Sequence, residues 1–114
     1  IREIKTIYEQ LQEILKVKIF PASDEWDRLY NVDFYIEING KYLGLQIKPV
    51  SQVSSIPEIF KEKGIQYNTH IKFKKKYGGN VFYIYSYKSD NKKIIANTEV
   101  IEEIRSEISR LSSL

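Results

Sequence analysis

An acid, an amide and a lysine occur close together near the middle of the chain: Asp33, Gln46 and Lys48. A carboxylate and a side-chain carbonyl are oxygen ligands that a hard divalent cation accepts, and a lysine ammonium can offset negative charge that develops in a reaction. The sequence has no cysteine and one histidine, His70, so oxygen atoms must supply most ligands of any metal site. These three residues are the first candidates for a catalytic site.

The segments that carry these residues are predicted to form a β-hairpin. Residues 32–38 and 41–48 alternate between polar and apolar side chains. Asn39-Gly40, which joins them, suits a two-residue turn because both central residues of such a turn take positive φ.

The register of the hairpin would bring the three candidates to one face. With a two-residue turn, Ile38 pairs with Lys41, and Asp33 then lies directly opposite Gln46. Lys48 follows Gln46 by two residues and shares its face. The predicted polar face consists of Asp33, Tyr35, Glu37, Tyr42, Gly44, Gln46 and Lys48. The opposite face is apolar and belongs to a core. A polar, solvent-side face of an ordinary hairpin remains the alternative.

Helices and further strands are predicted around the hairpin. In order they are a helix over residues 1–17, a short strand at 19–20, a loop over 22–31 and the two hairpin strands. Residues 57–77 follow, either as one helix with a weak point at Gly64 or as two short helices, with a stop at Gly78-Gly79. After them come a strand over 81–87, a turn at Asp90-Asn91, a short strand at 94–95 and a last helix capped by Asn97 or Thr98. The order α-β-β-β-α-β-β-α predicts an α/β (mixed α+β) fold.

Length and composition limit the class of protein. A chain of 114 residues with 42% hydrophobic residues suits one globular domain, and a net charge of +3 favours an anionic partner. No signal-peptide pattern is present, and no apolar stretch approaches the roughly 18 residues of a membrane span. We therefore expect a cytoplasmic protein that does not associate with membranes. Because the chain starts at Ile1 and has no methionine, we expect residues 1–114 to be a single domain from a longer chain.

The hairpin sequence V-D-F-Y-I-E-I-N-G-K-Y-L-G-L-Q-I-K resembles the PD-(D/E)xK nuclease superfamily. Its signature is an Asp, a hairpin, and an acid or amide two residues before a lysine. The predicted element order also resembles the αβββαβ core of that superfamily over most of the chain. Gln46 departs from the commonest form, which has Glu there, but Q-x-K variants occur, for instance in Mrr-like enzymes.

A narrower resemblance is to the MjaI-type restriction endonucleases. It rests on V-D-F-Y-I, L-Q-I-K-P, K-Y-G-G-N-V-F-Y-I-Y-S and the terminal E-V-I-E-E-I. The resemblance implies a three-layer, restriction-endonuclease-like core with a mixed sheet flanked by helices. It also implies a type II restriction enzyme that cuts double-stranded DNA at a short specific site with Mg²⁺, for which Mn²⁺ can substitute. Such enzymes usually dimerise, so we expect a homodimer.

The resemblance assigns roles to the candidate residues. Asp33, Gln46 and Lys48 would be catalytic, and Asp33, Gln46 and the Ile47 carbonyl would bind the metal. Lys48 would orient the attacking water or offset developing charge. Gly44 would leave the polar face open to the DNA backbone. Because Gln46 is uncharged, a further carboxylate could complete the site, and the candidates are Glu9, Glu13, Asp24, Glu25 and Asp27.

A basic run at residues 70–77 supplies candidate DNA contacts: His70, Lys72, Lys74, Lys75 and Lys76. The same lysines would also complement the dipole at a helix C-terminus. For His70 we favour a solvated or hydrogen-bonded surface histidine over a general base or a base-reading residue. Trp26 and the tyrosines could stack on bases, but packing within the fold is the favoured interpretation.

Three other functions fit the same features. A Holliday-junction-type resolving nuclease would use the same site but recognise branched DNA. A non-catalytic DNA-binding module could have kept the nuclease fold, and the uncharged Gln46 is the feature that favours it. A protein-interaction domain would bind no DNA at all.

Overall fold

The computed structural model describes residues 7–49, 68–89 and 92–114. Its elements are α1 (Ile7–Leu15), β1 (Phe20–Pro21), α2 (Asp24–Tyr30), β2 (Phe34–Ile38), β3 (Lys41–Pro49), helical residues 68–77, β4 (Gly78–Ser89), β5 (Lys92–Ile95) and α4 (Glu99–Ser112). The predicted weak point at Gly64 and turn at Asp90-Asn91, like residues 1–6 and 57–67 of the predicted helices, lie outside the described residues.

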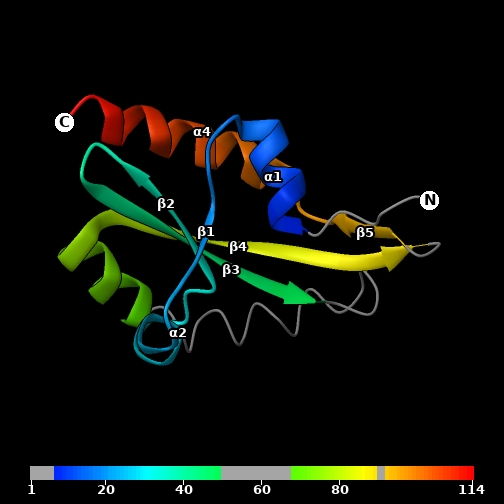
Figure 1. The fold of residues 1–114 in the computed structure, drawn as a ribbon, viewed down its shortest axis with the longest axis horizontal. Helices are drawn as coiled ribbons and strands as arrows, with labels where there is room; N and C mark the ends of the chain where they lie inside the picture. Colours follow the sequence, from blue (N-terminus) through cyan, green and yellow to red (C-terminus); the bar gives the residue numbers. More distant parts are fainter. Residues whose placement is uncertain (1–6, 50–67, 90–91) are drawn as a thin grey trace.

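One five-stranded sheet organises the fold, with the strand order β1-β2-β3-β4-β5. β3 and β4 are parallel and all other neighbours are antiparallel, so the sheet is mixed. Helices α1 and α4 lie on one face, and α2 and the 68–77 helix lie on the other (Figure 1). This is the predicted three-layer, restriction-endonuclease-like architecture. Within the described ranges, no helix has both the length and the apolar character needed to cross a membrane.

The β2–β3 hairpin has the predicted turn. Asn39 and Gly40 have φ angles of 56° and 79°, which Asn and Gly adopt more readily than other residues. Ile38 pairs with Lys41, and the same register holds to the pair between Phe34 and Leu45. The predicted register is therefore confirmed throughout β2.

The apolar face of the hairpin packs against α1 and α4. Buried side chains from both layers form a single core: Ile36, Leu43, Leu45 and Ile84 from the sheet, Ile7, Leu11 and Leu15 from α1, and Val100, Ile104 and Leu111 from α4. The spacing of the helical residues places them on one stripe of each helix, as the sequence predicts. Burial of this face fixes which side of β3 is left for a functional site.

The segment predicted as a loop over residues 22–31 contains a short helix, so that prediction is wrong. The Ser23 side chain caps α2 by accepting from the Trp26 amide, and Asn31 ends it in the left-handed conformation. Acidic residues in the first turn favour a helix start, because they complement the helix dipole. Seven residues are too few to display an apolar period, which explains why the pattern did not reveal the helix.

Gly44 does not open the sheet to DNA, contrary to the expectation. It is buried, and the side chains of Val32 and Val81 cover it. A Cβ at this position would lie 2.9 Å from a methyl carbon of Val32. Glycine is therefore needed here for close packing, and the face opposite the apolar core is itself covered at this point.

The start of β4 is held against α4 by a buried carboxylate. Glu107 is 5% exposed and accepts hydrogen bonds from the Asn80 amide at 2.7 Å and from the Arg110 side chain at 2.8 Å. Arg110 also donates to the Gly78 carbonyl. Gly78-Gly79 end the 68–77 helix as predicted, so this network fixes the point where the helix becomes β4.

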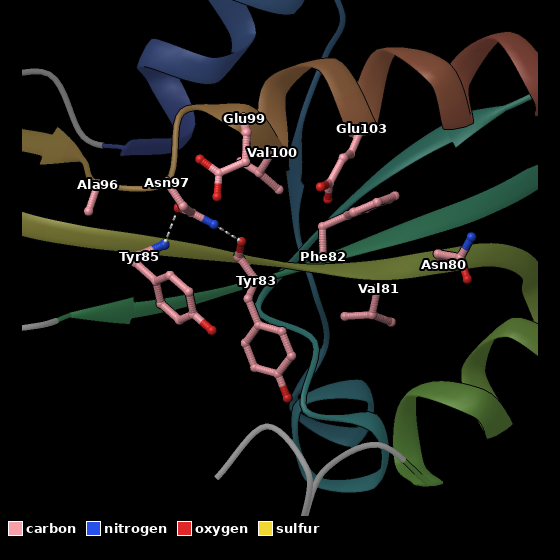
Figure 2. A pocket seen from close by; sticks show the side chains of 10 residues that line it. All are labelled: Asn80, Val81, Phe82, Tyr83, Tyr85, Ala96, Asn97, Glu99, Val100 and Glu103. Atoms are coloured by element: carbon pink, nitrogen blue, oxygen red, sulfur yellow. Dashed lines mark hydrogen bonds between the residues drawn. The ribbon is translucent and has the colours of Figure 1, made fainter. Parts of the chain in front are cut away.

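The middle of β4 is held by a side chain that was expected to cap α4. The predicted cap was Asn97 or Thr98, and Thr98 occupies the N-cap position without a side-chain bond. Asn97 instead accepts from the Tyr85 amide and donates to the Tyr83 carbonyl, as Figure 2 shows. The side-chain amide of Asn97 thus bonds the main chain of β4 at residues that β5 does not pair with.

We expect Glu107→Gln to destabilise the protein in a pH-dependent way. Hydrogen bonds from Arg110 lower the pKa of Glu107, although burial opposes them. A lowered carboxyl pKa contributes stability above the unfolded-state pKa, and that stability is lost as the pH falls through the folded-state pKa. The free energy of unfolding should fall by about 1–3 kcal/mol at pH 7 and by much less near the acid limit.

Thermal unfolding from pH 7 down to about pH 3 checks this expectation, since carboxyl groups titrate across that range. Glu103→Gln is the matched control, because Glu103 lies on the same helix and is exposed. An equal loss of stability at both ends of the pH range would contradict the assigned role of the charge.

Candidate active site

The Asp33 carboxylate lies at the point where β2 begins. Its Oδ2 accepts a hydrogen bond of 2.9 Å from the Ile47 amide of β3. Its own amide donates to the Leu45 carbonyl, and its carbonyl accepts from the Ala22 amide. Main chain and side chain together fix the position of this acid beside β3.

The expectation that Asp33 pairs directly with Gln46 is wrong in detail. Regular pairing stops at Phe34, and Asp33 instead contacts the residues on either side of Gln46 in the sequence. The chain leaves the sheet here to reach α2, so the carboxylate takes the place of a backbone acceptor for Ile47. The acid is nevertheless next to the predicted segment of β3.

The surroundings of Asp33 disfavour its charged form. Burial is the main cause that raises the pKa of Asp33, and the charge of Asp27 adds to it. The hydrogen bond from Ile47 and the charge of Lys48 act in the opposite direction. A cation bound at this carboxylate would offset the cost of its burial.

Gln46 is 7% exposed and its side chain contacts a histidine. The Nε2 of His70 lies 3.2 Å from Oε1 of Gln46. When that nitrogen carries its proton it donates to the amide oxygen, whose second lone pair remains for a further partner. His70 is half-buried, so it is a hydrogen-bonded histidine as favoured from the sequence, but it belongs to the site and not to the open surface.

Strand β4 adds two tyrosines to the same face. The parallel register places Gln46 beside Tyr83 and Lys48 beside Tyr85. Both tyrosine rings extend from the side of β4 that faces away from α4 (Figure 2). The Tyr83 ring also lies 5.1 Å from the His70 ring. Rings around Gln46 reduce its contact with water and so strengthen electrostatic interactions there.

The donor atoms on this face fit a small divalent cation that keeps part of its water shell. Mg²⁺ commonly uses one or two carboxylates and several waters. Asp33 supplies the carboxylate and Gln46 a neutral oxygen, both adjacent to Ile47. Among the described residues, no three acidic or histidine side chains converge on one point. The set is therefore sparse in negative charge.

Of the five acids considered as additional ligands, Asp27 is the one whose charge acts on Asp33. It lies on α2, the helix that the sequence did not predict. Glu9 and Glu13 are exposed on α1, which packs on the other face of the sheet (Figure 1). Asp24 and Glu25 are exposed in the first turn of α2.

The basic run has two sides. Lys72, Lys74, Lys75 and Lys76 are exposed, whereas Phe73 is fully buried and Tyr77 is half-buried. Phe73 therefore belongs to the interior, and Tyr77 packs within the fold, as favoured for the tyrosines from the sequence. The exposed lysines remain available to an anionic partner, and their role as DNA contacts stays a prediction.

We expect Asp33→Asn to keep or increase stability at neutral pH. A raised carboxyl pKa favours the folded state at low pH, and that contribution is lost as the pH rises through the folded-state pKa. Asparagine keeps an oxygen for the Ile47 amide but carries no charge. The unfolding temperature at pH 7.5 should equal or exceed that of the unchanged protein, and the difference should shrink in acid.

Asp24→Asn, a change at an exposed acid of α2, is the control for a general effect of charge. A clear drop in the unfolding temperature of Asp33→Asn at pH 7.5 would show that the charge of Asp33 stabilises the fold.

Comparison with known proteins bears on the chemistry of this site. The model of the MjaI restriction endonuclease family matches residues 1–111, a range that includes the whole hairpin, the 68–77 helix and β4. No curated protein and no solved structure matches significantly. Restriction endonucleases are DNA nucleases and generally use divalent metals. The chain belongs to the MjaI restriction endonuclease family.

Proposed function

We propose that the chain is the catalytic domain of a Mg²⁺-dependent type II restriction enzyme that hydrolyses phosphodiester bonds at a short specific site in duplex DNA. The observation that carries the proposal is the placement of the Asp33 carboxylate against the β3 segment that holds Gln46 and Lys48. Membership of a restriction endonuclease family supports DNA as the substrate.

Asp33, Gln46 and the Ile47 carbonyl would hold the metal. Within a strand, the amide and carbonyl of one residue point toward the same neighbouring strand. The Ile47 carbonyl therefore points to the same edge of β3 as its amide, which donates to Asp33. A divalent ion there supplies charge to stabilise the phosphoryl oxygens and lowers the pKa of a bound water. Mn²⁺, with similar preferences for oxygen, would substitute for Mg²⁺.

Two side chains would assist without binding the metal. The charge of Lys48 reaches Asp33, so its ammonium is suited to orient water or offset negative charge on the attacked phosphate. His70 would hold the Gln46 oxygen in place, because the hydrogen bond of 3.2 Å fixes the plane of the amide. The buried position of Gln46 also favours an amide, which costs less to desolvate than a carboxylate.

The DNA partner and the assembly follow from the same proposal. His70 and the exposed lysines Lys72, Lys74, Lys75 and Lys76 would contribute contacts to the DNA. Two active sites related by a two-fold axis can cut both strands of a palindromic site in one binding event, so we propose a homodimer whose axis coincides with that of the site.

Plasmid cleavage is the direct test. With about 10 mM Mg²⁺, an order of magnitude suited to a weakly held ion, we expect discrete fragments. Asp33→Ala and Lys48→Ala should each lower the cleavage rate by at least about 100-fold, since they remove a metal ligand and a charge that acts on the transition state. Chelation of the metal should stop cleavage.

Matched controls separate the site from general effects of charge. Glu103→Ala removes an exposed acid of α4, on the other face of the sheet, and Lys88→Ala removes an exposed lysine; both should leave cleavage intact. Cleavage that survives both active-site substitutions would refute the assigned residues. Selective cutting of four-way junctions would indicate a resolving nuclease, and Mg²⁺-independent binding without cutting would indicate a DNA-binding module.

We further expect Gln46→Glu to strengthen metal binding at the expense of the metal-free fold. A second carboxylate at a site that is 7% exposed is costly without a cation and favourable with one. The unfolding temperature without metal should fall, and Mg²⁺ should raise it at a concentration about tenfold lower than for the unchanged protein, which corresponds to about 1.4 kcal/mol. The same response in an Asp33→Ala background would show that the ion binds elsewhere.

A further inference from the structure

A cavity of about 410 Å³ lies near Asp33, on the face of the sheet that α2 covers. Its walls are four aromatic side chains, Trp26, Tyr35, Tyr42 and Tyr77, together with backbone and small side chains of residues 21–23. None of these lining residues is charged. The volume is within the range of about 300–1,000 Å³ common for small-ligand sites. These walls suit a flat, uncharged ring system.

Several of the rings that line the cavity meet one another at steep angles, whereas Trp26 and Tyr77 are tilted at 49° with their centroids 4.6 Å apart and Tyr35 is stacked on Phe20. The Trp26 and Tyr42 rings are 5.5 Å apart at 81°, and the Tyr42 and Tyr77 rings are 5.8 Å apart at 85°. Tyr35 meets Trp26 at 5.2 Å and 64°. All four side chains pack within the fold but are only half-buried, so part of each ring remains accessible. A planar group that enters the cavity would therefore contact the accessible parts of these rings.

Hydrogen bonds hold these walls in place. The Trp26 Nε1 donates to the Tyr77 hydroxyl at 3.2 Å, and the Ser23 cap fixes the first turn of α2. The Asn31 side chain donates to Thr69 at 3.0 Å, which ties the end of α2 to the 68–77 helix. A cavity formed in advance costs little conformational entropy when it is filled.

A cation lies beside Tyr77, one of the residues that line the cavity. The Nζ atom of Lys76 lies 5.7 Å from the centroid of the Tyr77 ring, and Lys76 is exposed. An aromatic cavity with a lysine beside one of its rings suits a molecule that joins a flat neutral ring to an anionic group. In a nucleic acid these two parts are the base and the phosphate of one nucleotide.

One wall of the cavity is hydrogen-bonded to Asp33 of the candidate active site. The Ala22 amide, in its wall, donates to the Asp33 carbonyl at 2.9 Å. Tyr35 follows Asp33 by two residues, which is about 7 Å along a strand. We propose that this cavity binds an unstacked base of the DNA, with the phosphate of that nucleotide beside Lys76. The inference rests on DNA as the substrate of the proposed function but requires no metal.

Fluorescence tests the proposal directly, because Trp26 is the only tryptophan in the sequence. Without metal, a mixed-sequence single strand of about 12 nucleotides should quench Trp26 emission as a base stacks in the cavity. An oligomer of abasic deoxyribose phosphates of the same length should bind by charge but quench little. Tyr35→Leu, which keeps apolar bulk and removes the ring, should weaken quenching-detected binding by about tenfold.

Matched variants test each half of the site. Tyr87→Leu changes a half-buried tyrosine outside the cavity and should bind normally. Lys76→Gln should weaken binding more than Lys75→Gln, since both lysines are exposed but Lys76 stands over the Tyr77 ring. The two lysine variants keep the proposal testable if Tyr35→Leu does not fold, which circular dichroism would show.

Unchanged Trp26 emission, or equal quenching by the abasic oligomer, would overturn the assignment. A change in emission that depends on protein concentration without DNA would also overturn it and would indicate a second copy of the chain in the cavity.

Failure of the proposed function gives a different result from failure of this inference. A protein that shows cavity-dependent quenching but cuts no DNA contradicts the enzymatic proposal alone, whereas cleavage without such quenching contradicts this inference alone.

Discussion

The central constraint in this fold is that β3 must serve two environments at once. One of its faces contributes Leu43 and Leu45 to the apolar core, while the other carries Gln46 and Lys48. It pairs with β2 on one edge and with β4 on the other, so all of its neighbours depend on its register. A shift by one residue would place the charged residues in the core and would be too costly to occur.

Placing an acid beside this strand has an electrostatic cost that shapes the site. Burial raises the pKa of Asp33, and the Ile47 amide and the charge of Lys48 only partly offset it. Gln46, with its amide held by His70, adds an oxygen to the same place without a second buried charge. The result is a site with few negative charges, consistent with a cation that keeps much of its hydration.

Aromatic side chains, and not solvated polar ones, cover much of the sheet face that carries Gln46 and Lys48. Trp26 packs by its edges against Tyr35, Tyr42 and Phe73, so a short helix with no fully buried residue is still anchored to the sheet. The same packing brings Asp27 of α2 toward Asp33 and leaves the aromatic cavity near it. In this region a single set of contacts supports the fold and shapes the surface near Asp33.

The sequence by itself determined what depends on local pattern. Alternation and Asn39-Gly40 predicted the hairpin and its register, and the resemblance of its motif predicted the family that the match over residues 1–111 shows. Only the tertiary structure decided features that need contacts between distant segments. It placed His70 on Gln46, Tyr83 beside that amide and Val32 over Gly44, because the parallel pairing of β3 with β4 and the packing of a second helical layer leave no local signal in the chain.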